Sequence, residues 1–175
     1  MNVLLVVTGG IAVYKSCEVV GRIKAKGHDV RVVMTRGATQ FVAPLTFSAL
    51  SGHPTQTEMF GSEKSDIEHI ELAKWADLVL VAPATYNFIG KMANGIADDL
   101  ATTVLAAIPA ETPIFIAPAM NTKMWENPIL QRNLESLKIL PNLKVIMPRH
   151  AILACGDRGI GAMEKPKEIV KAIFS

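Results

Sequence analysis

The stretch MNVLLVVTGGIAVYK, residues 1–15, decides the fold that the sequence predicts. We predict a strand at residues 2–7. After Asn2 it consists entirely of valine and leucine, which is typical of a strand buried on both faces. Two glycines follow at once, and from Ile11 onward apolar residues recur with helical spacing at Val19 and Ile23. A buried strand that turns through glycine into a helix is how a parallel α/β sheet begins.

The same alternation of strand and helix continues to the end of the chain. Further strands are predicted at residues 29–34, 77–82, 113–117 and 144–147, short segments at 41–50, and helices at 65–75, 85–93, 98–108, 128–138 and 165–174. Apolar strands that alternate with helices indicate a parallel sheet covered on both faces. We therefore predict a doubly wound α/β fold that forms a single domain over residues 1–175.

The composition narrows the class of protein. Half of the residues are apolar and 19% are charged, so we expect part of the surface to be buried against other subunits. Apolar runs fall short of the roughly 18 residues of a membrane span, and the N-terminus lacks the basic leader of a signal peptide, which predicts a cytoplasmic protein. A net charge of +2 without basic clusters gives no reason to predict nucleic acid binding. The two distant cysteines predict no disulfide, and we predict no metal site.

Ligands of such folds bind beyond the carboxyl ends of the strands, and the first of three sequence clusters there is Thr8-Gly9-Gly10. Glycine lets the backbone approach an anion, and the following helix offers free N–H groups. The GxGxxG spacing and the Walker lysine are both absent, so a plain turn explains this cluster equally well.

The second cluster follows the strand at 77–82 and the third follows the strand at 113–117. Thr85 and Asn87 can hydrogen-bond a planar polar ring, although Thr85, and Asp98 further on, can equally cap helices. Asn121 also suits a helix cap, and the Met124-Trp125 pair that follows it is more often core than contact.

Two single residues complete the candidate set. His69 stands between Glu68 and Glu71, whose carboxylates can hold an imidazolium, but a solvated histidine on a helix face is the commoner outcome. Cys155 stands in the glycine-rich stretch 154–161, which we interpret as a mobile loop, and a free thiol in such a loop favours a functional role.

Together and in this order, the motifs resemble the family of homo-oligomeric flavin-containing Cys decarboxylases. The likeness rests on Thr8-Gly9-Gly10, on Thr35 with Phe41 and Pro44-Leu45-Thr46, on His69, on Pro83-Ala84-Thr85 with Asn87, on Gly95 to Asp99, on Pro118-Ala119-Met120-Asn121 with Met124-Trp125, and on Ala154-Cys155-Gly156-Asp157. The resemblance implies a flavodoxin-like fold, FMN as cofactor, and trimers that sometimes associate into dodecamers.

It also implies a role for each matching residue. His69 and Cys155 match catalytic positions, and Asn121 with Met124 matches the substrate-binding motif. The positions that should line FMN are Gly9, Gly10, Ile11, Thr35, Phe41, Ala84, Thr85, Tyr86 and Asn87.

The Ala-Cys-Gly-Asp setting resembles the branch that decarboxylates 4'-phosphopantothenoylcysteine to 4'-phosphopantetheine in coenzyme A biosynthesis, through transient oxidation of the thiol to a thioaldehyde. Many relatives continue into a synthetase domain, so we expect either a stand-alone decarboxylase or one part of a longer protein. Three alternatives stay open: a peptidyl-cysteine decarboxylase, a flavin prenyltransferase, and a flavin-binding regulatory subunit without catalysis.

Overall fold

The computed structural model describes residues 1–59 and 68–175, so the predicted helix start at residues 65–67 lies outside the described residues. Five parallel strands form one sheet in the order β2-β1-β3-β4-β5. Their bounds are β1 (Asn2–Val7), β2 (Asp29–Met34), β3 (Leu78–Ala84), β4 (Ile114–Pro118) and β5 (Leu143–Val145). This order is the flavodoxin-like one, which confirms the predicted doubly wound fold.

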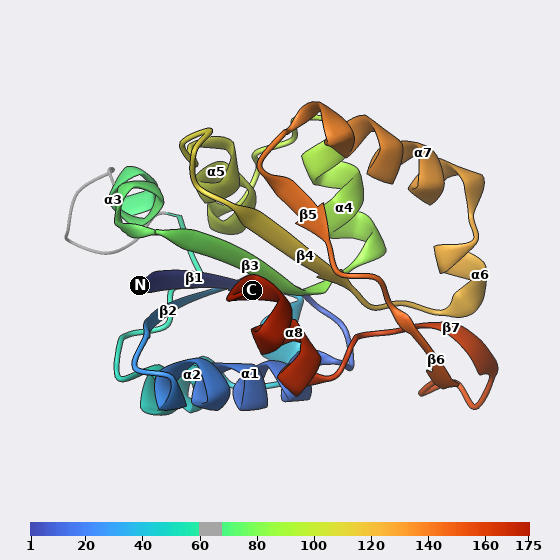
Figure 1. Cartoon of the computed structure of the whole chain (residues 1–175), viewed down its shortest axis with the longest axis horizontal. Helices are drawn as coiled ribbons and strands as arrows, with labels where there is room; N and C mark the ends of the chain where they lie inside the picture. Colours follow the sequence, from blue (N-terminus) through green and yellow to red (C-terminus); the bar gives the residue numbers. More distant parts are fainter. Residues whose placement is uncertain (60–67) are drawn as a thin grey trace.

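Helices cover both faces of this sheet (Figure 1). One face carries α1 (Val13–Ala25), α2 (Pro44–Ser51) and α8 (Pro166–Ile173), and the other carries α3 (Glu68–Trp75), α4 (Tyr86–Ala93), α5 (Leu100–Ala106) and α7 (Pro128–Ser136). Side chains alternate along β1, so that Val3 and Leu5 join the core under α1 while Leu4 and Val6 join the core under α4. A strand packed on both faces has to be apolar throughout, as the sequence of β1 is.

The glycine-rich stretch 154–161, predicted as a loop, is a loop only in its first half: Cys155 lies in a turn, whereas residues 158–161 belong to a strand, and there the prediction was wrong. Strands β6 (Arg149–Ile152) and β7 (Arg158–Ala162) pair as an antiparallel hairpin. The hairpin lies against the short helix α6 (Thr122–Trp125), where the N–H of Met120 donates to the carbonyl of Gly161 at 2.9 Å. A Cβ atom at Gly161 would collide with the Met120 carbonyl, so glycine is needed for this close packing even though it is uncommon inside strands.

The loops that follow β1 and β3 are tied together at the edge of the sheet. The hydroxyl of Thr8 donates to the carbonyl of Pro83 at 2.6 Å and accepts from the N–H of Thr85 at 3.0 Å. Because β2 continues the sheet on one side of β1 and β3 on the other, the loops diverge here and leave room for a ligand. Within the described ranges, the helices are too short or too polar to cross a membrane.

Candidate active site

A cavity of about 880 Å³ opens at the carboxyl ends of the strands and extends under the β6–β7 hairpin. It is lined by ten of the residues that the sequence predicts for the site: Gly9, Gly10, Ile11, Thr35, Thr85, Tyr86, Asn87, Asn121, Met124 and Cys155. They come from four strand ends and the hairpin, so the fold brings together residues far apart in the chain.

Two glycines shape one wall of the cavity. The turn after β1 passes so close to the turn after β2 that a Cβ atom on Gly9 would lie 2.6 Å from the backbone carbon of Gly37. Gly10 has more room, because its nearest neighbour would be the methyl group of Thr85 at 3.5 Å. Gly9 is therefore required for the two loops to pack together, whereas a side chain at position 10 would find space.

The opposite wall is formed by α4 and the start of α5. Thr85 caps α4 by accepting from the N–H of Phe88 at 3.4 Å. The cap of α5 is Asp99 and not the predicted Asp98, because the capping box pairs Asp99 with Thr102 at the third helical position. Lys91 pairs with both carboxylates, at 2.6 Å from Asp98 and 3.1 Å from Asp99.

These contacts set the charge of Asp99. Burial alone would raise the pKa of its carboxyl, but hydrogen bonds from Thr102 and Lys91 hold that pKa below its usual value. The carboxyl therefore stays ionised beside the cavity.

Asn121 and Cys155 meet at the mouth of the cavity. The side-chain oxygen of Asn121 accepts from the N–H of Lys123 at 2.8 Å and so caps α6, as predicted. Its amide nitrogen lies 3.3 Å from Sγ of Cys155, and Sγ lies 3.5 Å from a carboxylate oxygen of Asp157. The thiol therefore accepts from an amide and donates to a carboxylate.

Three predicted site residues do not line the cavity of this chain. Ala84 is fully buried in β3, and Phe41, after a short 3-10 helix at Ala38–Gln40, leaves half of its surface exposed. His69 lies in the first turn of α3, which packs against α5. The side chain of its neighbour Glu68 is outside the described part of the chain, so the expected pairing with His69 stays a prediction.

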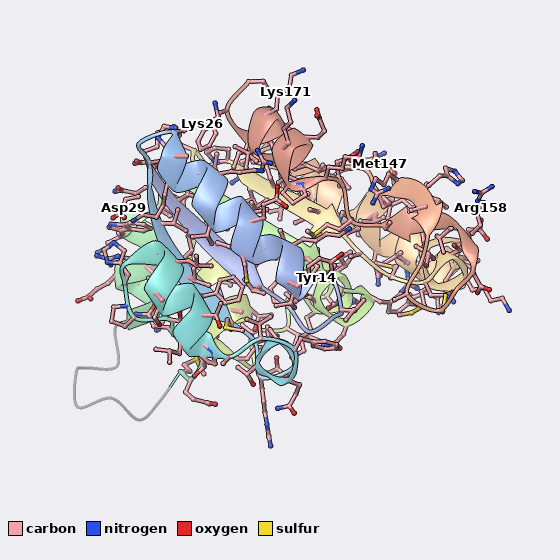
Figure 2. The ribbon with its side chains drawn as sticks, turned by 90° about the horizontal axis from the view of Figure 1, so that it is seen from below. Tyr14, Lys26, Asp29, Met147, Arg158 and Lys171 are labelled. Atoms are coloured by element: carbon pink, nitrogen blue, oxygen red, sulfur yellow. The ribbon has the colours of Figure 1, made fainter. Side chains whose placement is uncertain are left out.

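The cavity is lined by more basic side chains than acidic ones, which the sequence did not predict. Four basic side chains line it, and Asp99 is the one carboxylate among the described lining residues: the basic ones are Lys15, Arg36, Lys91 and Arg149. Lys15 stands in the first turn of α1 and Arg149 opens β6. Figure 2 shows that α1 turns its N-terminal end, at Tyr14, toward the part of the molecule that carries Arg158, and its other end, at Lys26, away from it. The spacing of these residues in sequence gives no signal that they meet.

Comparison with known proteins finds relatives over the whole chain. A family model described as flavoprotein matches residues 1–175. A coenzyme A biosynthesis bifunctional protein from Bacillus subtilis (strain 168) is 50% identical over 171 residues, which cover 97% of this chain and 41% of that protein. A probable phosphopantothenoylcysteine decarboxylase from Streptococcus mutans is 44% identical over 173 residues, covering 98% of this chain and 96% of that protein.

Solved structures agree with this relationship. A PPC decarboxylase mutant complexed with pantothenoylaminoethenethiol superposes with a TM-score of 0.86 at 33% identity, covering 99% of this chain and 96% of the other. The FMN-dependent cysteine decarboxylase SpaF superposes with a TM-score of 0.83 at 28% identity, covering 99% and 95%. The chain spans less than half the length of the bifunctional relatives. It covers 41% of the protein from Bacillus subtilis and 44% of a protein of the same name from Borreliella burgdorferi.

Proposed function

This chain belongs to the flavoprotein family, and on that premise we propose that it is an FMN-dependent decarboxylase of 4'-phosphopantothenoylcysteine. The observation that carries the proposal is the contact between Asn121 and Cys155 at the cavity mouth. It joins an amide that can bind a carboxylate to a thiol that can give a proton. The Streptococcus relative, of which this chain covers 96%, bears the name of this activity.

The cavity fits FMN by size and by the chemistry of its walls. About 880 Å³ lies within the range of natural ligand sites. Apolar side chains, hydroxyls and amides line it beside basic groups, which suits a planar polar ring that ends in a phosphate. Gly9, Gly10, Ile11, Thr35 and the stretch 85–87 would hold the cofactor. When bound, FMN supplies an acceptor for the hydride equivalent of a CH2–SH group.

Asn121 would hold the carboxylate that is lost as CO2. Its oxygen is already engaged in the cap of α6, which fixes the rotamer and turns the NH2 group toward the cavity mouth. A hydrogen bond to a charged group contributes roughly 1.5–3 kcal/mol, and a fixed donor loses little entropy on binding. The cap therefore orients the recognition group before the substrate arrives.

Cys155 would deliver a proton to the carbon that loses CO2, once an enethiol has formed. The thiol is held between the amide of Asn121 and the carboxylate of Asp157. Because Asp157 is exposed, it can exchange protons with water and return one to Cys155 after each turnover. The proton thus comes from the side of the substrate that the hairpin covers.

We further propose that the protein acts as a homo-oligomer, with a trimer as the smallest form. Ile11 and Tyr14, which line the cavity, are each 59% exposed, and Phe41 before α2 and Leu45 in α2 are 49% and 78% exposed. Burying such apolar side chains against a second copy is favourable. It would also account for His69, which could then manage a proton in the cavity of a neighbouring chain.

The direct test uses the purified protein and two substrates. We expect a yellow protein with a flavin spectrum that converts 4'-phosphopantothenoylcysteine to CO2 and 4'-phosphopantetheine, followed by mass spectrometry. A peptide that ends in cysteine should react far more slowly. A colourless protein that does not take up FMN, or one that prefers the peptide, contradicts the proposal.

A further inference from the structure

Lys15 and Arg149 are two cations that face the same part of the cavity from different elements. Burial of the ammonium group lowers the pKa of Lys15, and the positive charge of Arg149 lowers it further, against the opposing effect of Glu164. Two like charges that line one cavity repel each other, and here the repulsion from Arg149 outweighs the attraction of Glu164. A further negative charge beside the two cations would therefore be stabilising.

The described part of the chain provides no such charge at contact distance. Its ion pairs are Arg22–Glu18, His53–Asp29, Lys91 with Asp98 and Asp99, and Lys138–Glu135. Lys15 Nζ lies 5.9 Å from the centroid of the Tyr14 ring, a contact that does not neutralise the ammonium. Glu164 turns an oxygen to the N–H of Lys165 at 2.7 Å. Both cations thus remain available to an anion.

Arg149 adds a second, independent sign. Its Nε atom is buried and has no hydrogen-bond partner among the described residues. Buried donors are nearly always paired in native proteins, so an unpaired one inside a cavity indicates an acceptor that a ligand brings. The other basic residues of the cavity do not share this feature, because Lys91 is paired with two carboxylates and Arg36 is exposed.

We propose that Lys15 and Arg149 together bind a phosphate monoester in the part of the cavity that the start of α1 and the β6–β7 hairpin both line. A phosphate dianion between them removes their repulsion and gives Nε of Arg149 its acceptor. The planar guanidinium group offers paired donors to phosphate oxygens, and the ammonium acts as a compact charge. Arg149 lies directly across the hairpin from Ala162, a small residue that also lines the cavity and leaves this space open.

The inference rests on the proposed function, because both FMN and the proposed substrate end in a phosphate monoester and either one could supply the bound phosphate. Two pairs of ligands distinguish the phosphate of the cofactor from that of the substrate. The apoprotein is titrated with FMN and with riboflavin, and the flavin-loaded protein with 4'-phosphopantetheine and with pantetheine. Binding is followed by fluorescence and calorimetry, so no turnover is needed.

The variants are Lys15→Met and Arg149→Met, which remove charge and keep length. Their matched controls are Lys26→Met, just after the far end of α1, and Arg158→Met, at the start of β7, both of them exposed residues outside the cavity lining. Lys15→Arg and Arg149→Lys keep the charge. The preference is the ratio of the dissociation constants of the two ligands in a pair. We expect Lys15→Met and Arg149→Met each to lower this ratio about tenfold, which is about 1.4 kcal/mol. Controls and charge-keeping variants should retain most of it.

Each outcome decides the matter. Loss confined to the pantetheine pair assigns the site to the substrate's phosphate, and loss confined to the flavin pair assigns it to the cofactor's phosphate; either supports the inference. An unchanged preference in both pairs for folded methionine variants overturns it. If the wild-type protein releases no CO2 but its phosphate preference still depends on Lys15 and Arg149, the proposed function fails and the phosphate site stands.

Discussion

The amide nitrogen of Asn121 lies 3.3 Å from the sulfur of Cys155, although 34 positions separate the two residues in sequence. The side-chain oxygen of Asn121 caps α6, which fixes the orientation of this side chain. Cys155 belongs to the hairpin that lies on the same helix. The proposed site therefore depends on the seating of one short hairpin on one short helix.

Asn121→Asp separates recognition from folding. Aspartate caps a helix as well as asparagine does, so α6 should persist, but its charge would repel the substrate carboxylate. We expect kcat/KM to fall by roughly 10- to 150-fold, the equivalent of the lost charge-assisted hydrogen bond. Asn127→Asp is the matched control, because Asn127 caps α7 outside the cavity lining. Equal activity of both variants would remove Asn121 from carboxylate binding.

Cys155→Ser should split the reaction into its two halves. Serine keeps the hydrogen bonds but is a far weaker acid, so CO2 should still be released while the enethiol accumulates. We expect the rate of 4'-phosphopantetheine formation to fall at least about 100-fold, measured by product mass against CO2. Cys17→Ser, half-buried in α1, should behave as wild type. A normal product yield from the Cys155 variant contradicts its role as proton donor.

His69→Asn should release no CO2 by itself. If His69 serves a neighbouring chain, mixed oligomers of His69→Asn and Asn121→Asp subunits should regain part of the activity, since some cavities then receive one intact residue from each chain. The measurement is CO2 release after co-refolding or co-expression of the two variants. Failure of every mixture to recover, with mixed oligomers verified by mass, places His69 outside this role.

Gly9→Ala should destabilise the fold, because its Cβ would stand 2.6 Å from the backbone of Gly37. We expect the free energy of unfolding to fall by about 1–3 kcal/mol, as overpacking typically does. Gly10→Ala is the matched control and should stay within about 0.5 kcal/mol of wild type. Urea denaturation measures both, and equal stability of the two variants would show that the loops can separate without cost.

Asp99→Asn should make stability depend less on pH. The pKa of Asp99 is lowered in the folded protein, so its charge stabilises the fold above the unfolded pKa, near 3.9. This contribution is lost as the pH falls through the lower, folded pKa. We expect the variant to be less stable at pH 7 by up to about 1 kcal/mol, with the gap closing in acid. Urea titrations across pH test this, and a gap that is independent of pH contradicts it.

The sheet could be predicted because its strands are buried on both faces, which leaves continuous apolar runs such as residues 78–82. The hairpin could not, because the glycines that let it lie against Met120 and Thr122 read as loop residues in sequence. The cap of α5 was placed one residue early, since Asp98 and Asp99 both satisfy the pattern and only the position of Thr102 decides between them.

Within the site, the residues at strand ends were predictable and the charges were not. Gly9, Thr85 and Asn121 stand one to three residues after the end of a strand, so topology alone brings them to one edge. Lys15 and Arg149 line one cavity only because the hairpin returns the chain to the carboxyl ends of the strands, and no local sequence pattern predicts that return. The likeness to a known family supplied the roles of His69 and Cys155, which residue spacing left open.

The seating of Gly161 against Met120 limits when Cys155 can act in the proposed reaction. The contact between the Asn121 amide and the Cys155 sulfur joins α6 to the hairpin, so it exists only while the hairpin rests on that helix. A substrate held by Asn121 would lie under the same hairpin. In the proposed reaction, a single arrangement therefore both binds the carboxylate and presents the last proton.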